Sequence, residues 1–596
     1  MANYATIAVN PTIGDWDGQV GIVRRAIDES RKQGADVLVF PELAIGGPDA
    51  GDLFWRPDTA AASENALAQI APLTKGITLV IGAPISHNGK LYNVAAVFHD
   101  GLLLALVPKR YPTFHTSEER WFSRWDFKRT EQHLGAVIGN YTPRIPGLER
   151  VFVITGTVED YPSPESGATY IIVCNRAYAI GAYREELARH MEYSRALSVT
   201  MVKTNLLGSD DGRMIYDGGG YILVNGQFTA MSPRFTFNQD YVITTTSSPM
   251  QNSFDPTLAQ FDKVGSSPKT EADYTFAELE LALCLGLNDY LKRAHIQRLC
   301  LALSGGRDSA MIAIIAARLL AITNPDASPD VLRKKMHDFL FTAYMPSQTS
   351  SSSSTHKAAQ ALAKHFGFDC HIIPIGAWAN LITSAIESNV GRKLTWEKDD
   401  LTLQNVQARA RSSFIWTLAN ARDALLLTTG NLSEAAVGYA TMDGDSSGCL
   451  DPIGNIPKTI VSKWLEWARN FHQIQALDLV FAQPPSAELR PLNTKQADET
   501  DLMPYPVLDS FIQWFVIERL TPKEVFQKTR SLLGSYYKND DDIKRDIKRF
   551  VGLCTRAQWK RVRFANSFRV MPFDISEIGL QWPCVQDGFS AACKEL

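Results

Sequence analysis

The sequence lacks the features that mark membrane-spanning and secreted proteins. No stretch of its 596 residues approaches the run of about eighteen apolar residues that a transmembrane helix needs. The first residues, Met-Ala-Asn-Tyr-Ala-Thr, do not place a basic segment before an apolar one, so we expect no signal peptide. We therefore expect a cytoplasmic protein without a membrane partner.

The sequence also lacks a charge excess and any paired cysteine motif. The net charge is −4 with 21% charged residues, which argues against a nucleic-acid partner. The eight cysteines are scattered, and no two of them form a Cys-x-x-Cys motif. This usage predicts free thiols in a reducing compartment rather than disulfides or a zinc site.

One short segment carries the strongest chemical signal in the chain. An apolar run over 299–303 leads into Ser304, Gly305 and Gly306, and a helical pattern follows over 311–320. A buried strand, a glycine turn and a helix N-terminus form an anion site, because backbone N–H groups converge there and the helix dipole favours negative charge. Ser304 and Ser309 add hydroxyl donors. Asp308 would repel a phosphate unless a divalent cation lay between them, so the segment predicts a phosphate and metal site. The alternative is an ordinary strand–turn–helix connection.

Further motifs favour the first interpretation. Ser-Gly-Gly-x-Asp-Ser resembles the phosphate loop of the N-type ATP pyrophosphatases. With the segments downstream of it, the region of roughly 276–565 resembles the glutamine-dependent NAD synthetase family, and the first 260 residues resemble that family's nitrilase-like amidase domain. The segments are 345–347 (MPS), 405–411 (NVQARAR), 428–434 (TTGNLSE), 437–441 (VGYAT), 456–459 (IPKT) and 484–491 (PPSAELRP).

Alternating apolar and helical segments predict an α/β protein in two domains. We expect a nitrilase-like α/β sandwich over 1–260, a linker over 261–275, and a doubly wound parallel-sheet ATP pyrophosphatase domain over 276–596. The expected strands include 5–9, 36–40, 338–344, 370–374 and 424–428, and 349–355 is expected to be a serine-rich loop, either a surface linker or a mobile lid.

The resemblance implies an ATP-dependent, amide-forming ligase. ATP and Mg²⁺ would activate a small-molecule carboxylic acid, and ammonia would then displace AMP. Family motifs assign Asp308, Lys458 and Glu434 to catalysis, with Asp308 and Glu434 as the magnesium ligands. The implied ATP-binding residues are Ser304, Gly305, Gly306, Asp308, Ser309, Thr429, Lys458 and Ser486. The implied substrate-binding residues are Asn405, Arg409, Glu434 and Lys560. The resemblance also implies a homo-oligomer.

Three positions depart from the family pattern near the expected substrate. Leu432 stands where a lysine is common, Asp443 where an aromatic residue is common, and Arg307 where the family is usually apolar. These departures do not affect the residues implied for ATP chemistry, but they leave the identity of the carboxylic acid substrate undetermined. One alternative is a paralogue that amidates another carboxylic acid in secondary metabolism. Another is a non-catalytic assembly protein that binds a dinucleotide.

The amidase half lacks its nucleophile. Nitrilase-like domains use a Glu–Lys–Cys set, in which Glu is the general base and the Cys thiolate attacks the amide. Glu42 and Lys109 match the first two, and the segment 118–122 matches one that often holds a second Glu. Val158 stands at the Cys position. Cys174 lies one strand beyond, where a buried structural thiol is the usual outcome.

This loss leaves three explanations for the amidase half. It is a structural relic that supports oligomerisation, it binds a ligand without cleaving it, or the ligase takes ammonia from solution or from a separate glutaminase. We favour the relic.

Overall fold

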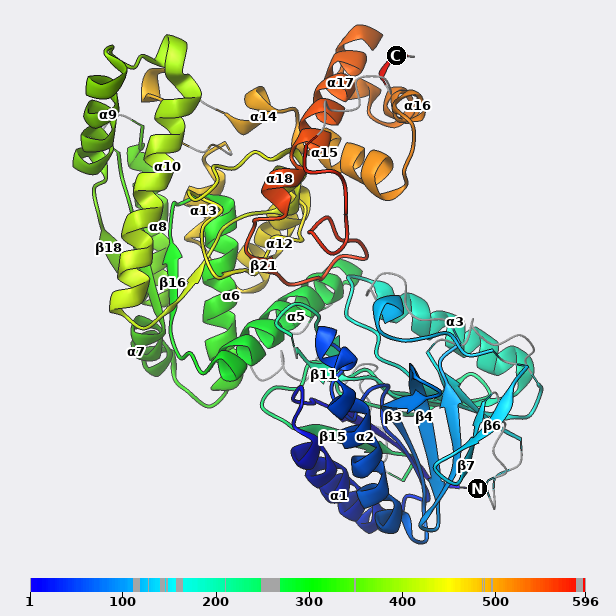
Figure 1. The fold of residues 1–596 in the computed structure, drawn as a ribbon. Coiled ribbons are helices and arrows are strands. Elements are labelled where there is room, and N and C mark those ends of the chain that lie inside the picture. The colour runs from blue at the N-terminus through cyan, green and yellow to red at the C-terminus, as the bar shows by residue number, and fades with distance from the viewer. Residues whose placement is uncertain are drawn as a thin grey trace. The chain divides into compact units, whose positions relative to one another are not determined.

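The computed structural model divides into two compact units. It describes residues 2–110, 118–126, 128–139, 145, 148, 150–156, 165–209, 211–247, 268, 270–347, 350–484, 486, 488–494, 497–585, 593, 594 and 596. The first unit comprises 1–268 with 288–293, and the second comprises 269–287 with 294–596 (Figure 1). Among the described helices, none is both long and apolar enough to cross a membrane.

The first unit is built on two sheets. One has eight strands in the order β15-β1-β2-β3-β4-β5-β7-β6, and the other has five in the order β14-β13-β10-β9-β8. Their strands, with the short pair β11 and β12, are β1 Tyr4–Val9, β2 Val37–Val39, β3 Thr78–His87, β4 Lys90–His99, β5 Leu102–Pro108, β6 Thr130–His133, β7 Ala136–Gly139, β8 Val151–Thr155, β9 Thr169–Val173, β10 Thr200–Lys203, β11 Leu207–Gly208, β12 Tyr216–Asp217, β13 Tyr221–Val224, β14 Gln227–Met231 and β15 Tyr241–Thr245.

Side-chain alternation along the strands separates the layers of this unit. In β2, Val37 and Val39 join a core cluster that also holds Ile171 and Ile222 of the second sheet. Leu38, between them, joins a different cluster with the helices α1 (Trp16–Lys32) and α2 (Pro57–Ile70). Neighbouring residues of a strand face opposite sides. The helix α3 (Ala182–Leu197) packs on the outer face of the second sheet. The predicted α/β sandwich is confirmed.

The second unit contains a six-stranded parallel sheet. Its order is β18-β17-β16-β19-β20-β21, so the chain reverses direction across the sheet between β16 and β19. In open α/β sheets such a reversal point is where ligands bind, beyond the carboxyl ends of the strands. The strands are β16 Leu299–Ala302, β17 Leu340–Tyr344, β18 Asp369–Ile372, β19 Leu425–Leu427, β20 Leu450–Asp451 and β21 Asn566–Ser567.

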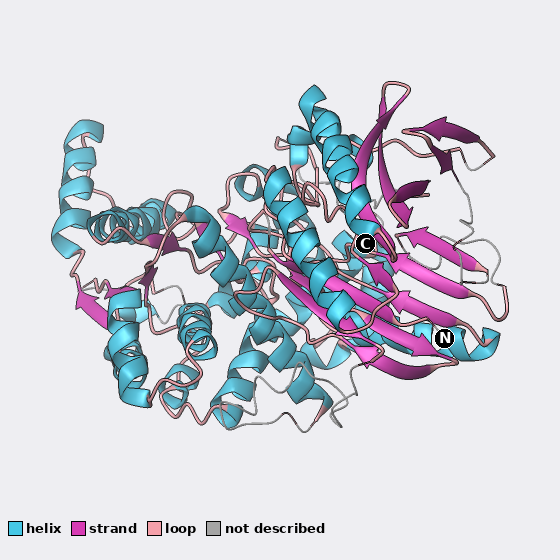
Figure 2. Cartoon of the chain, turned by 90° about the horizontal axis from the view of Figure 1, so that it is seen from below, coloured by secondary structure: helices cyan, strands magenta, loops and turns pink. Residues whose placement is uncertain are grey.

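Figure 2 shows helices beside the strands. Helices near the C-terminus of the chain form a separate cluster (Figure 1). The apolar core of that cluster joins α11 to α15 and α17 through side chains such as Val437, Leu508 and Phe550. The helices from α5 onward are α5 Glu271–Ala294, α6 Arg307–Thr323, α7 Pro329–Phe339, α8 Ser353–Phe366, α9 Gly376–Val390, α10 Trp396–Ala421, α11 Leu432–Val437, α12 Lys458–Phe471, α13 Leu477–Phe481, α14 Asp498–Asp501, α15 Tyr505–Phe511, α16 Pro522–Leu532, α17 Asp540–Arg556 and α18 Gln558–Arg561. Residues 288–293 of α5 are counted with the first unit.

Two segments that were expected to lack regular structure are partly helical. The predicted linker 261–275 lies largely outside the described residues, and its last five residues form the start of α5. In the predicted serine loop, the Ser352 hydroxyl accepts a hydrogen bond from the backbone N–H of Thr355 and caps α8, which begins at Ser353. Serine favours helix N-caps for this reason, so 353–355 is helical rather than a loop.

Candidate functional site

The glycine loop after β16 has the geometry of an anion site. Gly305 has a φ of +84°, and a Cβ atom there would lie 2.2 Å from the carbonyl oxygen of Thr355, so only glycine fits. The Ser304 hydroxyl accepts a hydrogen bond from the Gly306 N–H at 3.2 Å and lies 3.0 Å from the Ser309 hydroxyl. The first helical residue of α6 is Arg307. The predicted strand, turn and helix N-terminus are therefore all present.

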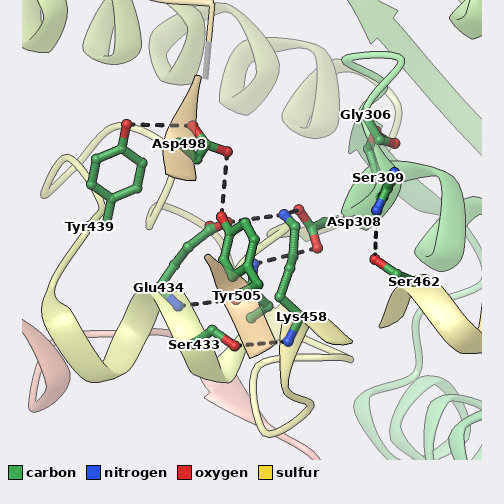
Figure 3. Close-up of polar contacts among 12 residues, drawn as sticks. Gly306, Asp308, Ser309, Ser433, Glu434, Tyr439, Lys458, Ser462, Asp498 and Tyr505 are labelled. Carbon is green, nitrogen blue, oxygen red and sulfur yellow. Dashed lines mark hydrogen bonds and ion pairs between the residues drawn. The ribbon is translucent and has the colours of Figure 1, made fainter. Parts of the chain in front are cut away.

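A buried lysine lies between two carboxylates beside this loop. Lys458 opens α12 and is 4% exposed. Its ammonium contacts the carboxylate of Asp308, in the first turn of α6, and lies 3.0 Å from Glu434 Oε1, in the first turn of α11 (Figure 3). The structure thus brings the three residues predicted to be catalytic into direct contact.

Burial and neighbouring charges shift the pKa values of Asp308 and Lys458. Burial raises the pKa of Asp308 to about 6, although Lys458 lowers it; Glu434 adds a further increase by like-charge repulsion. Burial lowers the pKa of Lys458, but Asp308 and Glu434 together raise it by more, so it stays above its ordinary value. Lys458 therefore keeps its proton at neutral pH.

This arrangement fits the Mg²⁺ that the family implies. Among the described residues, no three His, Cys, Asp or Glu side chains are placed to hold a metal by themselves. Mg²⁺, however, commonly binds through one or two carboxylates together with substrate phosphates. The carboxylates of Asp308 and Glu434 both contact the Lys458 ammonium, so the two lie close enough to bind one cation together with a substrate phosphate.

The predicted ATP-contacting hydroxyls also lie near the loop in the fold. Thr429 follows β19, the strand that pairs with β16. Ser486 accepts a hydrogen bond from the Glu488 N–H at 3.3 Å, and the Glu488 carboxylate accepts one from the Thr355 hydroxyl at 3.0 Å. Because the carbonyl of Thr355 borders Gly305, the segment with Ser486 is linked to the phosphate loop.

The predicted substrate-binding side chains gather around the segment 438–443. Asn405 Oδ1 accepts a hydrogen bond from the Thr441 hydroxyl at 2.8 Å, and Arg409 Nε donates to the Met442 carbonyl at 3.1 Å. Lys560 Nζ donates to the carbonyls of Gly438 and Ala440, each at 2.7 Å. Burial lowers the pKa of Lys560. Side chains from α10 and α18 therefore meet at a single segment that follows Glu434.

The positions that depart from the family fall into different environments. Leu432 is fully buried in the C-terminal core cluster, where its side chain packs away from solvent. Arg307 Nη1 donates to the Ser462 hydroxyl at 2.9 Å and so ties α6 to α12. Asp443 is exposed and lies 3.2 Å from Arg563 Nη2. Of the three, only Asp443 lies on the 438–443 segment.

The first unit holds a second buried polar cluster. Lys109 Nζ lies 2.6 Å from Glu42 Oε1 and 2.8 Å from Glu118 Oε2. The amide of Asn93 donates to both carboxylates, at 2.6 Å to Glu42 and 2.7 Å to Glu118. The predicted pair Glu42 and Lys109 is therefore assembled. No sequence motif indicated that Asn93 belongs to this site, because it lies 51 residues from Glu42 in the sequence.

Burial and charge shift the pKa values of Glu42 and Lys109 in this cluster. Burial raises the pKa of Glu42 to about 7, against the lowering effect of Lys109. Its Oε2 atom is buried without a hydrogen-bond partner. Burial lowers the pKa of Lys109, but the two carboxylates raise it by more.

No thiol in the described part of the first unit is suited to act with this cluster. Cys174 is 3% exposed, and burial raises its pKa to about 11, so the thiol stays protonated at neutral pH. The backbone carbonyl of Cys174 accepts a hydrogen bond from the backbone N–H of Glu42 at 3.3 Å. Val158, at the sequence position of the nucleophile, lies outside the described residues.

Both units match known protein families, and relatives with one shared name match over most of the chain. Residues 280–541 match the NAD synthase family model, and residues 4–126 match the carbon-nitrogen hydrolase model. The chain is 29% identical over 555 residues to a glutamine-dependent NAD(+) synthetase of Thermotoga maritima, covering 87% of this chain and 89% of that protein. A relative of the same name from Aquifex aeolicus is 27% identical over 560 residues, covering 89% and 91%.

Solved structures agree with these matches. A glutamine-dependent NAD(+) synthetase from Cytophaga hutchinsonii superposes with a TM-score of 0.85 at 28% identity, covering 100% of this chain and 99% of that one. An Acinetobacter baumannii NAD+ synthetase in complex with ADP shares the fold, with a TM-score of 0.64 at 22% identity over 99% of each chain. The chain therefore carries a carbon-nitrogen hydrolase domain followed by an NAD synthase domain, is similar over most of its length to glutamine-dependent NAD(+) synthetases, and is an NAD synthetase-like carbon–nitrogen ligase.

Proposed function

We propose that this ligase uses ATP and free ammonia to convert the carboxylate of nicotinate adenine dinucleotide into the amide of NAD. The observation that carries the ligase chemistry is the buried Lys458 between Asp308 and Glu434, next to the glycine loop. Such a cluster supplies a fixed positive charge where a triphosphate must be held and cleaved.

The residues suit adenylation followed by amidation. A carboxylate oxygen of the acid attacks the α-phosphorus of ATP, the bond to pyrophosphate breaks, and an acyl-adenylate forms. Backbone N–H groups of the loop at Ser304–Gly306 hold the leaving phosphates, and Lys458 stabilises their charge. Mg²⁺ held by Asp308 and Glu434 would neutralise the charge on the departing pyrophosphate. Ammonia then attacks the acyl carbon, AMP leaves, and the nitrogen loses a proton.

The nitrogen source follows from the first unit. Its Glu42 and Lys109 retain the base and the cation, but Cys174 is the only cysteine in residues 1–268 and its thiol is buried. A valine at 158 cannot form the acyl-enzyme that glutamine hydrolysis needs. Ammonia therefore comes from solution or from a separate glutaminase.

A comparison of nitrogen donors tests the proposal. Pyrophosphate and NAD formation are measured with ATP, Mg²⁺ and nicotinate adenine dinucleotide, using either ammonium chloride or ammonia-free glutamine. We expect turnover with ammonium alone, and the same turnover in Cys174→Ala. Glutamine-driven turnover that disappears in Cys174→Ala would show that Cys174 is the nucleophile. Glutamine-driven turnover that persists in Cys174→Ala, from protein free of other glutaminases, would also contradict the proposal.

Asp443 favours one second candidate, a related ligase for another carboxylic acid. It places an exposed carboxylate on the 438–443 segment, where Asn405, Arg409 and Lys560 converge. The same pyrophosphate assay with a panel of carboxylic acids separates the two candidates. If no acid of the panel supports pyrophosphate release, both ligase candidates fail, and a non-catalytic assembly protein that binds a dinucleotide remains.

We also propose that the protein is a homo-oligomer. In the second unit, α9 buries none of its residues in the monomer, and its apolar side chains Trp378, Leu381, Ile386 and Val390 are all more than 40% exposed. Exposed apolar clusters of this kind mark association surfaces, and symmetric pairing is the commonest form of assembly.

A further inference from the structure

A tyrosine hydroxyl links Glu434 to a third buried carboxylate. Tyr505, the first residue of α15, is 4% exposed, and its hydroxyl lies 3.0 Å from Glu434 Oε1 and 3.4 Å from Asp498 Oδ2 (Figure 3). Asp498, the first residue of α14, is also 4% exposed. Tyr505 and Asp498 were not among the site residues predicted from the sequence. Tyr505 contacts Glu434 and Lys458 of the trio, and Asp498 contacts Tyr505.

The second carboxylate oxygen of Asp498 has a contact of its own. Its Oδ1 atom lies 3.4 Å from the Tyr439 hydroxyl, which also donates to Asp501 Oδ2 at 3.0 Å. Asp501 in turn accepts two hydrogen bonds from Arg490 Nη1, at 2.8 and 2.9 Å. The pair Asp498 and Tyr505 is therefore part of a connected network.

We propose that Tyr505, anchored by Asp498, is a positioning residue that fixes the Glu434 carboxylate for magnesium and ATP. Glu434 Oε1 receives both the Lys458 ammonium and the Tyr505 hydroxyl, and the two donors define where that oxygen lies. Partners behind a metal ligand fix its orientation in this way, and their loss typically weakens metal affinity or activity about 10–100-fold. This inference rests on the proposed function, since it assigns the role of Tyr505 at the same site.

The phenol ring itself has a separate contact. The Lys458 ammonium lies 5.5 Å from the centre of the Tyr505 ring, within cation–π range. Tyr505→Phe keeps this contact and the packing in the C-terminal core, and it removes only the hydroxyl. It is therefore the variant that tests the hydrogen bond to Glu434.

The primary measurement is ATP binding without turnover. Calorimetric titration with ATP over a series of MgCl₂ concentrations, in the absence of any acid, gives the Mg²⁺ concentration for half-maximal binding. We expect this concentration to rise by about 10-fold in Tyr505→Phe. Tyr537→Phe removes a hydroxyl from a tyrosine packed against the same core cluster and should match the wild type. A Tyr505→Phe titration equal to the wild type would overturn the proposal.

Asp498→Asn tests the anchor independently and keeps the proposal testable if Tyr505→Phe folds poorly. We expect a weaker Mg²⁺ response in Asp498→Asn, and no further loss in the double variant beyond that of Tyr505→Phe, because both act through one hydroxyl. Fully additive losses would show that Asp498 does not act through Tyr505. In steady state, Tyr505→Phe should lower kcat and leave the KM for the acid unchanged.

The two proposals can fail separately. Wild-type protein that binds ATP with Mg²⁺ but amidates no acid would refute the ligase function, and the binding titrations would still decide the role of Tyr505. Active wild-type protein with an unaltered Tyr505→Phe titration would refute only the positioning role.

Discussion

The ammonium of Lys109 lies 2.6 Å from the Glu42 carboxylate, in a buried cluster that also holds Glu118 and Asn93. Two carboxylates, an ammonium and an amide are all buried there and satisfy one another, apart from Glu42 Oε2 and Asn93 Oδ1. The first unit thus holds a buried carboxylate and a buried ammonium side by side, and under the proposed function the nucleophile is the missing part.

Val158→Cys should therefore introduce glutamine-dependent turnover. The new thiol would stand at the sequence position of the nucleophile, with Glu42 to take its proton and Lys109 to stabilise the oxyanion. The measurement is NAD formed with glutamine as the sole nitrogen source. Val158→Cys combined with Glu42→Gln is the control, and it should return to the background of the wild type. No glutamine-driven turnover in Val158→Cys would mean that more than the nucleophile has been lost.

The titration of Glu42 predicts a pH-dependent stability. Its pKa is raised from 4.5 to about 7 by burial, so the folded state binds a proton more tightly than the unfolded state. Its contribution is therefore complete below pH 4.5 and is lost as pH rises through 7. Between pH 5 and 8 the wild type should lose roughly 2 to 3 kcal/mol relative to Glu42→Gln, whose side chain does not titrate. Calorimetric melting midpoints at the two pH values measure the difference.

A surface variant provides the control for this experiment. Glu119 is exposed and paired with Arg124, so Glu119→Gln should follow the wild type at both pH values. Parallel pH profiles for the wild type and Glu42→Gln would show that the raised pKa of Glu42 is not expressed in stability.

Asp308→Ala should abolish acid-dependent pyrophosphate release. The variant removes a proposed magnesium ligand and one of the two partners of Lys458. A metal that neutralises developing charge contributes several kcal/mol, so we expect a loss of at least about 100-fold. Asp326→Ala, at an exposed turn of the same unit, should retain activity. An unchanged melting midpoint with near wild-type turnover in Asp308→Ala would contradict the assignment.

Local patterns predicted the parts of the site that lie close together in sequence. The apolar strand, the glycines and the helical pattern around Ser304–Ser309 are consecutive, and β16 and α6 form as expected. The burial of Leu432 in the core has a simple geometric reason. It lies two residues from Glu434 on α11, and successive helical residues turn by about 100°, so the two side chains point in nearly opposite directions.

Contacts between distant segments had no sequence signal. Tyr505 lies 71 residues from Glu434, and the segment around it carries no pattern that distinguishes its hydroxyl from one in an ordinary core. Asn93 likewise resembles any other polar residue of a long strand. Such side chains become part of a site only when the strands and helices that carry them pack, which is a property of the tertiary structure.

The exposed apolar side chains of α9 predict that association depends on this helix. Leu381 is 60% exposed there, and an aspartate at this position would have to be desolvated when two copies meet. We expect light scattering at micromolar concentration to give a mass above the 66.1 kDa of one chain for the wild type and a shift toward the monomer for Leu381→Asp. Leu532, at the end of α16, is 64% exposed, so Leu532→Asp is a matched control that should leave the mass unchanged. A wild-type protein that is monomeric and fully active would contradict the proposed assembly, and an equal shift in both variants would place the association surface elsewhere.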